Sequence, residues 1–124
     1  MHGDELRVLV VEDNHDTAES LRQLLALCGY RVTVAHTSRA GLDAATRLQP
    51  HIVLCDIGLP DQDGYVVASV LRQNANTSSA RLIAVTARSG ARERRLALAA
   101  GFDEHLVKPV DPRVLLRELA YVPG

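Results

Sequence analysis

The chain has 124 residues, of which 47% are hydrophobic and 23% charged, and its formal net charge is −1. This length and composition are typical of one ordinary domain, so we expect residues 1–124 to form a single domain with a core over about 6–119. The charge argues against a basic surface for nucleic acid, the apolar runs are too short to span a membrane, and the N-terminus lacks a signal-peptide pattern, which together favour a cytoplasmic protein that binds neither nucleic acid nor membranes.

Short apolar runs alternate with longer segments at helical period along the whole chain. The first half predicts, in order, strand Leu6–Val11, a helix from Asn14 or His15 that stops at Gly29, strand Arg31–Ala35, helix Ser38–Leu48 before Pro50, and strand Ile52–Asp56. The second half predicts helix Gly64–Gln73, a loop over 74–80, strand Arg81–Thr86, helix Ala91–Ala100 before Gly101, strand Glu104–Val107, and a last helix that opens at Asp111 with Pro112.

Strict alternation of strands and helices predicts a parallel sheet that is covered by helices on both faces. The runs Val8–Val11 and Ile52–Cys55 are apolar without interruption, as strands buried on both faces are. Because crossover connections are right-handed, the sheet must be wound both ways, and we expect a doubly wound α/β fold of three layers with strand order 2-1-3-4-5. In such sheets ligands bind beyond the carboxyl ends of the strands where the order reverses, here between the first and third strands.

Apolar positions at helical spacing predict the inward faces of the first three helices. These positions are Ala18, Leu21, Leu24, Leu25 and Cys28 in the first helix, Leu42, Ala45 and Leu48 in the second, and Val67, Val70 and Leu71 in the third. The two cysteines, Cys28 and Cys55, lie in apolar surroundings and are expected to be reduced core thiols. Neither they nor the five histidines show metal-ligand spacing, so we expect no transition-metal site.

Carboxylates stand at the ends of two strands that the predicted order places side by side. Glu12 and Asp13 follow the first strand, and Asp56 ends the third. Three closely packed carboxylates raise one another's pKa and need a cation among them. Magnesium fits this need, with manganese as an alternative, because it prefers hard oxygen ligands and keeps waters that a phosphate can replace.

The remaining strands of this edge end in groups that bind phosphate. Thr86 and Ala87 supply a hydroxyl and a backbone N–H, and Lys108 supplies an ammonium that can hold a phosphoryl oxygen. Acids, metal, hydroxyl and ammonium together predict a site for an aspartyl phosphate. In that site Asp56 attacks phosphorus while the metal and the lysine neutralise charge on the transferring group.

The sequence resembles a response-regulator receiver domain, the phosphorylated module of two-component signalling, from Leu6 to about Leu119. The matching motifs are "VVEDN", "CDIGLPDQDG", "VTA" and "VKP", which occur in order and at the right intervals. The stretches "DIGLPDQDGY" and "GFDEHLVKPVD" are most similar to receivers attached to hybrid histidine kinases. The resemblance implies a flavodoxin-like (βα)5 fold with the strand order given above.

The resemblance also implies a role for individual residues of this edge. The implied roles are Asp56 as phosphoacceptor and metal ligand, Asp13 as a direct magnesium ligand, Glu12 as a ligand mainly through water, Gly58 as a ligand through its backbone carbonyl, Thr86 and the N–H of Ala87 as phosphoryl-binding groups, Lys108 as the partner of the phosphoryl group, and a cis bond between Lys108 and Pro109.

The function that the resemblance implies is a phosphorylation switch. Magnesium-dependent transfer from a phosphohistidine would load Asp56, slow autodephosphorylation would unload it, and the output face would change its affinity for a partner. The donor would be a histidine kinase or a histidine phosphotransfer domain, and a downstream protein would bind the fourth helix, fifth strand and fifth helix. The domain would catalyse its own phosphorylation and dephosphorylation rather than turn over an external small molecule.

Two positions depart from the commonest pattern of the family. His105 stands where a Tyr or Phe usually swings inward on activation, so an imidazole would fill the space that Thr86 leaves. Gly58 stands where a side chain often affects access of water to the phosphoryl group, and Arg88 borders the same path. The arginines of the fourth helix would either dock an acidic partner or form only a solvated face.

Three other functions stay open. A flavodoxin-type binder of FMN would need a phosphate-cradling loop after the first strand, where "EDNHD" would repel a phosphate instead. A phosphatase or phosphotransferase acting on small substrates through an aspartyl phosphate would normally carry a second acid where Gly58 stands. A pseudo-receiver used only for protein interaction would have no need of the acids and Lys108.

Overall fold

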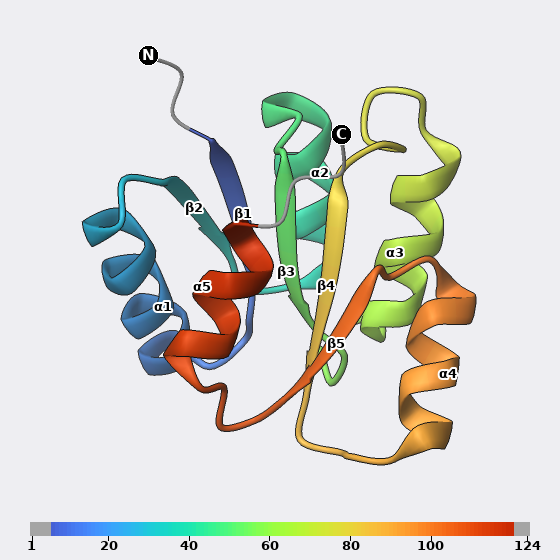
Figure 1. The fold of residues 1–124 in the computed structure, drawn as a ribbon. Coiled ribbons are helices and arrows are strands. Elements are labelled where there is room, and N and C mark those ends of the chain that lie inside the picture. The colour runs from blue at the N-terminus through green and yellow to red at the C-terminus, as the bar shows by residue number, and fades with distance from the viewer. Residues whose placement is uncertain (1–5, 121–124) are drawn as a thin grey trace.

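Five parallel strands form one sheet in the order β2-β1-β3-β4-β5, with helices on both faces (Figure 1). The computed structural model describes residues 6–120, so the N-terminal stretch 1–5 and the C-terminal stretch 121–124 lie outside the description. The elements are β1 Arg7–Val11, α1 His15–Leu27, β2 Arg31–Ala35, α2 Ser38–Leu48, β3 Ile52–Asp56, α3 Gly64–Gln73, β4 Arg81–Thr86, α4 Ala91–Ala100, β5 Glu104–Val107 and α5 Pro112–Ala120. The doubly wound fold and its strand order are confirmed.

The helix boundaries follow from local capping. Asn14 accepts a hydrogen bond from the Thr17 N–H at the start of α1, and Thr37 and Asp63 cap α2 and α3 in the same way. Gly29 follows α1 with φ +95°, which is the left-handed ending that the sequence predicts. Gln49, which follows the last residue of α2, has φ +48° although it is not a glycine. The first strand begins at Arg7, one residue later than predicted.

The core consists of two apolar layers that the sheet separates. One layer joins the sheet to α1 and α5, and the other joins it to α2, α3 and α4. The central strands β1, β3 and β4 have buried side chains on both faces, which explains their uninterrupted apolar runs. Within residues 6–120 no helix has the length and hydropathy of a membrane span.

Two core predictions are wrong. Val70 is 41% exposed, because the buried stripe of α3 runs through Gly64, Val67, Ala68 and Leu71 and leaves Val70 at its margin. Cys28 is exposed and Cys55 alone is a buried thiol. Cys28 lies past the last helical residue of α1, in a turn where its neighbours in sequence are exposed as well.

The sheet order brings the carboxyl ends of β1, β3, β4 and β5 to one edge. Val11 pairs with Cys55, Asp56 pairs with Val85, and Thr86 pairs with Val107. Residues that follow these positions are therefore neighbours, although they lie up to about a hundred positions apart in the chain. All the residues predicted to carry chemistry stand at this edge.

Candidate functional site

A cluster of three carboxylates occupies the edge where β1 and β3 end. Oxygen atoms of Glu12, Asp13 and Asp56 lie within 4.8 Å of one another. Glu12 is 2% exposed and Asp56 is 7% exposed, whereas Asp13 is exposed. Three acids with hard oxygen atoms, two of them shielded from water and one open to it, form a donor set that fits a divalent cation such as Mg²⁺.

Lys108, the only lysine of the chain, follows β5 and contacts the cluster through its side chain. Its Nζ lies 2.8 Å from Oε1 of Glu12 and 3.3 Å from Oδ2 of Asp56. Its backbone N–H donates to the Thr86 carbonyl at 2.8 Å, and the bond to Pro109 is cis. The ammonium is thus held between two buried acids by a backbone that is fixed to the neighbouring strand.

Burial and charge act together on these groups. Burial raises the pKa of Glu12, and the hydrogen bonds that this carboxylate accepts from Lys108 and from the Asn14 N–H offset the effect only in part. Burial lowers the pKa of Lys108, but its hydrogen bond to Glu12 and the charges of Asp56 and Glu12 outweigh burial and raise the pKa above the usual value. One ammonium among three acids leaves an excess of negative charge, which a metal ion would neutralise.

The backbone after Asp56 leaves free space beside its carboxylate. Gly58 donates its N–H to Oδ1 of Asp56 at 3.0 Å, and this contact orients the carboxylate. A Cβ added at Gly58 would meet only Oδ1 of Asp56, at 3.8 Å, so the space around the glycine is free. The bare glycine therefore leaves this side of the Asp56 carboxylate unobstructed by a side chain at position 58.

The predicted switch residues lie on the neighbouring strands. Thr86 is 6% exposed and its Oγ1 accepts the Arg88 N–H at 3.1 Å, while Ala87 is exposed beside it. His105 pairs with Ala84, which lies two residues before Thr86 on β4. Because side chains alternate between the faces of a strand, His105 is on the same face of the sheet as Thr86. Its Nε2 is buried and has no hydrogen-bond partner among residues 6–120.

Gly64 is a residue of this site that the sequence analysis placed only at the start of a helix. A Cβ at this position would lie 2.6 Å from the Asp56 carbonyl oxygen and 2.9 Å from the Ile57 Cα. The Gly64 N–H also donates to the Ile57 carbonyl at 2.9 Å. The first turn of α3 thus packs directly on the backbone that carries the Asp56 side chain, a contact between segments whose only sequence signal is the glycine itself.

We expect Gly64→Ala to displace this backbone and to lower the free energy of unfolding by about 1–3 kcal/mol, because neither backbone atom it meets can move freely. Phosphorylation of the folded fraction should fall as well. Urea unfolding measures the first effect and mass spectrometry the second. Gly58→Ala is the matched control for unfolding, since its methyl group enters free space, and an equal loss of stability in both variants would contradict the packing argument.

The cavity at the amino edge of the sheet fits a ligand less well than the carboxyl edge does. A cavity of about 800 Å³ lies at the amino edge of the sheet and includes Arg7, Arg72 and Arg81. These guanidinium groups are engaged: Arg7 donates to two carbonyls at the end of α2, Arg72 to three carbonyls and to Asp103, and Arg81 pairs with Glu118. The carboxyl edge, with its converging acids, is the better candidate.

Sequence and fold both relate this chain to one family of known proteins. The response regulator receiver domain family matches residues 8–120. The transcriptional regulatory protein YxdJ of Bacillus subtilis is 34% identical over 113 residues, which cover 91% of this chain and 48% of that protein. The chain thus spans about half the length of this relative.

Solved structures agree. A putative response regulator from Chloroflexus aurantiacus has a TM-score of 0.88 at 28% identity and covers 94% of this chain and 95% of its own. The receiver domain of sensor histidine kinase PA1611 from Pseudomonas aeruginosa, solved with a magnesium ion in its active-site cleft, has a TM-score of 0.85 at 31% identity over 94% and 95% of the two chains. With the family match over nearly all of its length, this chain belongs to the response-regulator receiver domains.

Proposed function

We propose that this receiver domain takes a phosphoryl group from a phosphohistidine onto Asp56 and works as the switch of a two-component pathway. The observation that carries the proposal is the position of Lys108, whose Nζ lies 3.3 Å from Asp56 and 2.8 Å from Glu12 at the edge where three acids meet. A carboxylate nucleophile with an ammonium beside it and a cation site around it has the parts that phosphoryl transfer needs.

The transfer exchanges one bond to phosphorus for another. An oxygen of Asp56 bonds to phosphorus, the bond from phosphorus to the imidazole nitrogen of the donor breaks, and that nitrogen keeps the electron pair and is protonated. Lys108 would hold a phosphoryl oxygen throughout. Glu12, Asp13, Asp56 and the Gly58 carbonyl would hold Mg²⁺, with Mn²⁺ as an alternative, and the ion would neutralise charge on the phosphoryl oxygens.

Removal of the phosphoryl group reverses the loading. Water attacks phosphorus and the bond to the Asp56 oxygen breaks, so inorganic phosphate leaves and the carboxylate is restored. The open space at Gly58 supports access for this water. The domain would therefore catalyse its own phosphorylation and dephosphorylation, with no external small molecule as a turnover substrate.

Phosphorylation would change the face formed by α4, β5 and α5. The Thr86 hydroxyl and the Ala87 N–H, which follow each other at the end of β4, would turn to the new phosphoryl oxygens. His105 lies on the same face of the sheet as Thr86 and would fill the space that the threonine leaves. A downstream protein that binds α4, β5 and α5 would sense this rearrangement as a shift between two populations.

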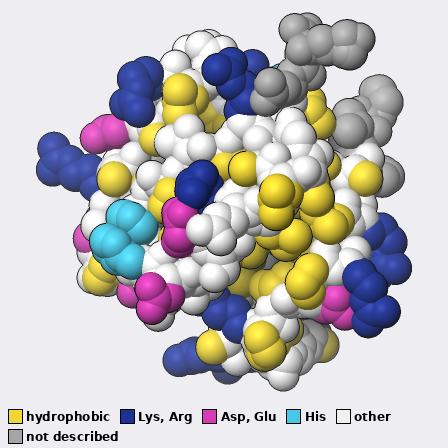
Figure 2. Space-filling model, turned by 90° about the vertical axis from the view of Figure 1, so that its left-hand side faces the viewer, with side chains coloured by type: hydrophobic (Ala, Val, Ile, Leu, Met, Phe, Trp, Pro, Cys, Tyr) yellow, Lys and Arg dark blue, Asp and Glu magenta, His cyan; other side chains and the backbone are white. Residues whose placement is uncertain are grey.

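The donor would be a histidine kinase or a histidine phosphotransfer domain. A groove of about 730 Å³ runs between α1 and the β5–α5 connection, and Lys108 forms part of its wall. Its lining is mainly apolar, with Leu21, Leu24, Val110 and Leu115 among its residues. Figure 2, which views the molecule from the α1 side, shows hydrophobic side chains gathered about a hollow. A donor helix in this groove would lie beside Asp56.

The proposal includes a cytoplasmic location, where nucleotides supply the phosphoryl groups of kinases.

The test is phosphorylation by phosphoramidate, which contains the same kind of phosphorus–nitrogen bond as phosphohistidine. We expect the wild-type protein to gain one phosphoryl group in Mg²⁺ and none in a chelator, and the Asp56→Asn variant to gain none. Intact-protein mass spectrometry reads the result. Asp63→Asn, which changes another acid of the same loop, serves as the control and should be labelled like the wild type. Equal labelling of the wild type and Asp56→Asn would refute the assignment.

A further inference from the structure

The connection between β2 and α2, together with the first residues of α2, contacts both loops that carry the acidic cluster, although it supplies no acid itself. Glu12 and Asp13 stand on the β1–α1 loop, and Gly58 stands on the β3–α3 loop just after Asp56. These two loops belong to different strand–helix units, so the strands alone fix only where each loop starts. Residues 36–39 lie between them and bond to each.

The first contact is with the β1–α1 loop and with His15, the first residue of α1. The rings of His36 and His15 are stacked, with centroids 3.7 Å apart and planes 9° from parallel. Nδ1 of His36 lies 2.9 Å from the Glu12 carbonyl oxygen, and since a carbonyl only accepts, this nitrogen carries the hydrogen and donates. The Glu12 N–H donates to the Ala35 carbonyl at 2.9 Å. Residues 35 and 36 thus hold both backbone groups of Glu12.

The second contact is with the β3–α3 loop. The Asp61 carboxylate accepts the Ser38 N–H at 2.8 Å and the Arg39 N–H at 3.0 Å, which are orphan donors at the start of α2. These bonds from Arg39 and Ser38 lower the pKa of Asp61 to about 2. The fully buried Ser38 hydroxyl donates back to the Gln62 carbonyl at 2.6 Å. Three hydrogen bonds therefore tie this loop to α2.

We propose that residues 36–39, held by His15 and Glu12 on one side and by Asp61 and Gln62 on the other, form a brace that sets the distance between the two loops of the cation site. His36, Ser38 and Asp61 are then positioning residues for the metal. This inference rests on the proposed cation site but makes a separate claim, namely that motion of one loop is coupled to the other through the brace.

Coupling of this kind matters most for a small cation. Mg²⁺ requires near-ideal octahedral geometry, whereas Ca²⁺ accepts flexible and irregular oxygen sites. Loops that drift apart would therefore lose Mg²⁺ affinity much more than Ca²⁺ affinity. A variant that merely unfolds part of the protein would lower both affinities by the same factor, so the ratio of the two affinities separates positioning from general destabilisation.

The decisive experiment measures backbone amide hydrogen exchange in the metal-free protein. His36→Ala removes only the side-chain contacts with His15 and Glu12, yet the brace predicts faster exchange in 57–62. Asp61→Ala removes only the two hydrogen bonds from the Ser38 and Arg39 N–H groups, yet it should speed exchange in 12–14. His36→Phe keeps the stacked ring and loses one hydrogen bond, and Asp61→Asn keeps one acceptor, so these milder variants should show smaller changes of the same kind. Exchange that rises only on the side of the substitution would overturn the brace.

Calorimetric titration of the same variants gives the second readout. We expect His36→Ala and Asp61→Ala to weaken Mg²⁺ binding by about tenfold, as other residues that support metal ligands do, and Ca²⁺ binding by much less. Asp63→Ala is the control, because it removes a charge from the same loop. Among the described residues, the Asp63 carboxylate accepts only from the Val66 N–H in the helix that it caps, so it makes no hydrogen bond to residues 36–39. Equal losses for the two ions, or losses no larger than in Asp63→Ala, would refute the inference. A wild-type protein that binds no Mg²⁺ would instead refute the proposed cation site, and the exchange pattern would still decide the brace.

Discussion

Replacing Lys108 by methionine is expected to slow phosphorylation of Asp56 by about 100-fold and at the same time to tighten Mg²⁺ binding. Methionine keeps most of the length of the side chain and removes the ammonium. The slower transfer follows from the proposed role of the ammonium, which lies 3.3 Å from Oδ2 of Asp56 and would meet the charge on the transferring group. Labelling by phosphoramidate, followed over time by mass spectrometry, measures the rate.

The tighter Mg²⁺ binding is expected because the ammonium and the metal ion compete for the same carboxylates. In the metal-free protein Lys108 neutralises Glu12 and Asp56, so it competes with any cation for the same acids. Without the ammonium, no positive charge offsets the negative charges of the three acids. A divalent ion in this partly buried site is then attracted more strongly, and we expect its affinity to rise roughly tenfold. Titration calorimetry measures this change.

Opposite signs make the Lys108 prediction easy to contradict. Arg113→Met removes a positive charge from the same end of the molecule, but the Arg113 side chain is 92% exposed and pairs with Asp111, so neither rate nor affinity should change. A Lys108→Met variant that loses both phosphorylation and Mg²⁺ binding would show that Lys108 holds the site together rather than neutralising charge. Because the chain has one lysine, selective labelling of lysine also gives a single ammonium signal that should shift on adding Mg²⁺ to the wild type.

The position of the site could be predicted because it follows from topology. Apolar runs at Val8–Val11 and Ile52–Cys55 indicate strands buried on both faces, and right-handed crossovers then leave few orders for the sheet. Once β1 and β3 are neighbours, Glu12 and Asp56 must meet, whatever the details of the loops. Because the carboxyl ends of parallel strands all lie at one edge, the acidic residues at these ends were sufficient to predict where the site lies.

The contacts that shape the site could not be predicted in the same way. Gly64 and Asp61 are residue types common in turns, and nothing in the local sequence assigns them a further role. Gly64 nevertheless packs on the backbone of Asp56, and Asp61 caps a helix that begins 23 residues before it. Such contacts depend on how loops from different strand–helix units approach each other, which no local pattern encodes. The exposure of Val70 and Cys28 has a related origin. Helical period predicts which side of a helix faces the sheet, but not how far along and across that side the neighbouring elements shield it from solvent.

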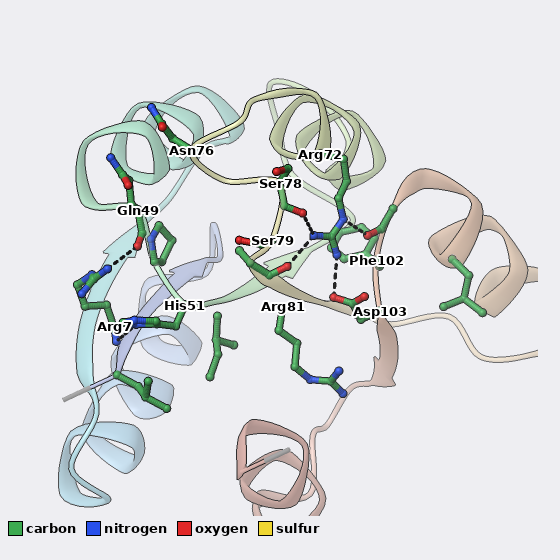
Figure 3. A pocket seen from close by; sticks show the side chains of 16 residues that line it. Arg7, Gln49, His51, Arg72, Asn76, Ser78, Ser79, Arg81, Phe102 and Asp103 are labelled. Atoms are coloured by element: carbon green, nitrogen blue, oxygen red, sulfur yellow. Dashed lines mark hydrogen bonds and ion pairs between the residues drawn. The ribbon is translucent and has the colours of Figure 1, made fainter. Parts of the chain in front are cut away.

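Arg72 is a further residue whose role depends on contacts between distant segments. Its Nε donates to the Gly101 carbonyl at 2.8 Å, one terminal nitrogen donates to the carbonyls of Ser78 and Ala80, and the other pairs with Asp103 at 2.7 Å. Figure 3 shows the guanidinium of Arg72 among these groups at the amino edge of the sheet. One side chain thus joins α3 to the segments that lead into β4 and β5.

Removing this guanidinium should be among the most destabilising changes outside the apolar core. Arg72→Met keeps the apolar part of the side chain, against which Gly101 packs, but leaves three carbonyls without their donor. Each buried acceptor left unpaired costs about 1–3 kcal/mol. Water reaches part of this edge, since the Arg72 side chain is 25% exposed, so we expect a total loss of about 2–4 kcal/mol in the free energy of unfolding.

Urea unfolding measures the Arg72 effect, and Arg113→Met again provides the control, with an expected change below about 0.5 kcal/mol. The loss should be one of stability alone. Arg72 lies at the opposite edge of the sheet from the acids, so Arg72→Met should bind Mg²⁺ per folded molecule as the wild type does, and Asp56 should accept phosphate at the same rate. A stable variant would show that water replaces the guanidinium at these carbonyls. A stable fold that had lost Mg²⁺ binding would show that the two edges are coupled through the strands, against the view that each loop is positioned by its own contacts.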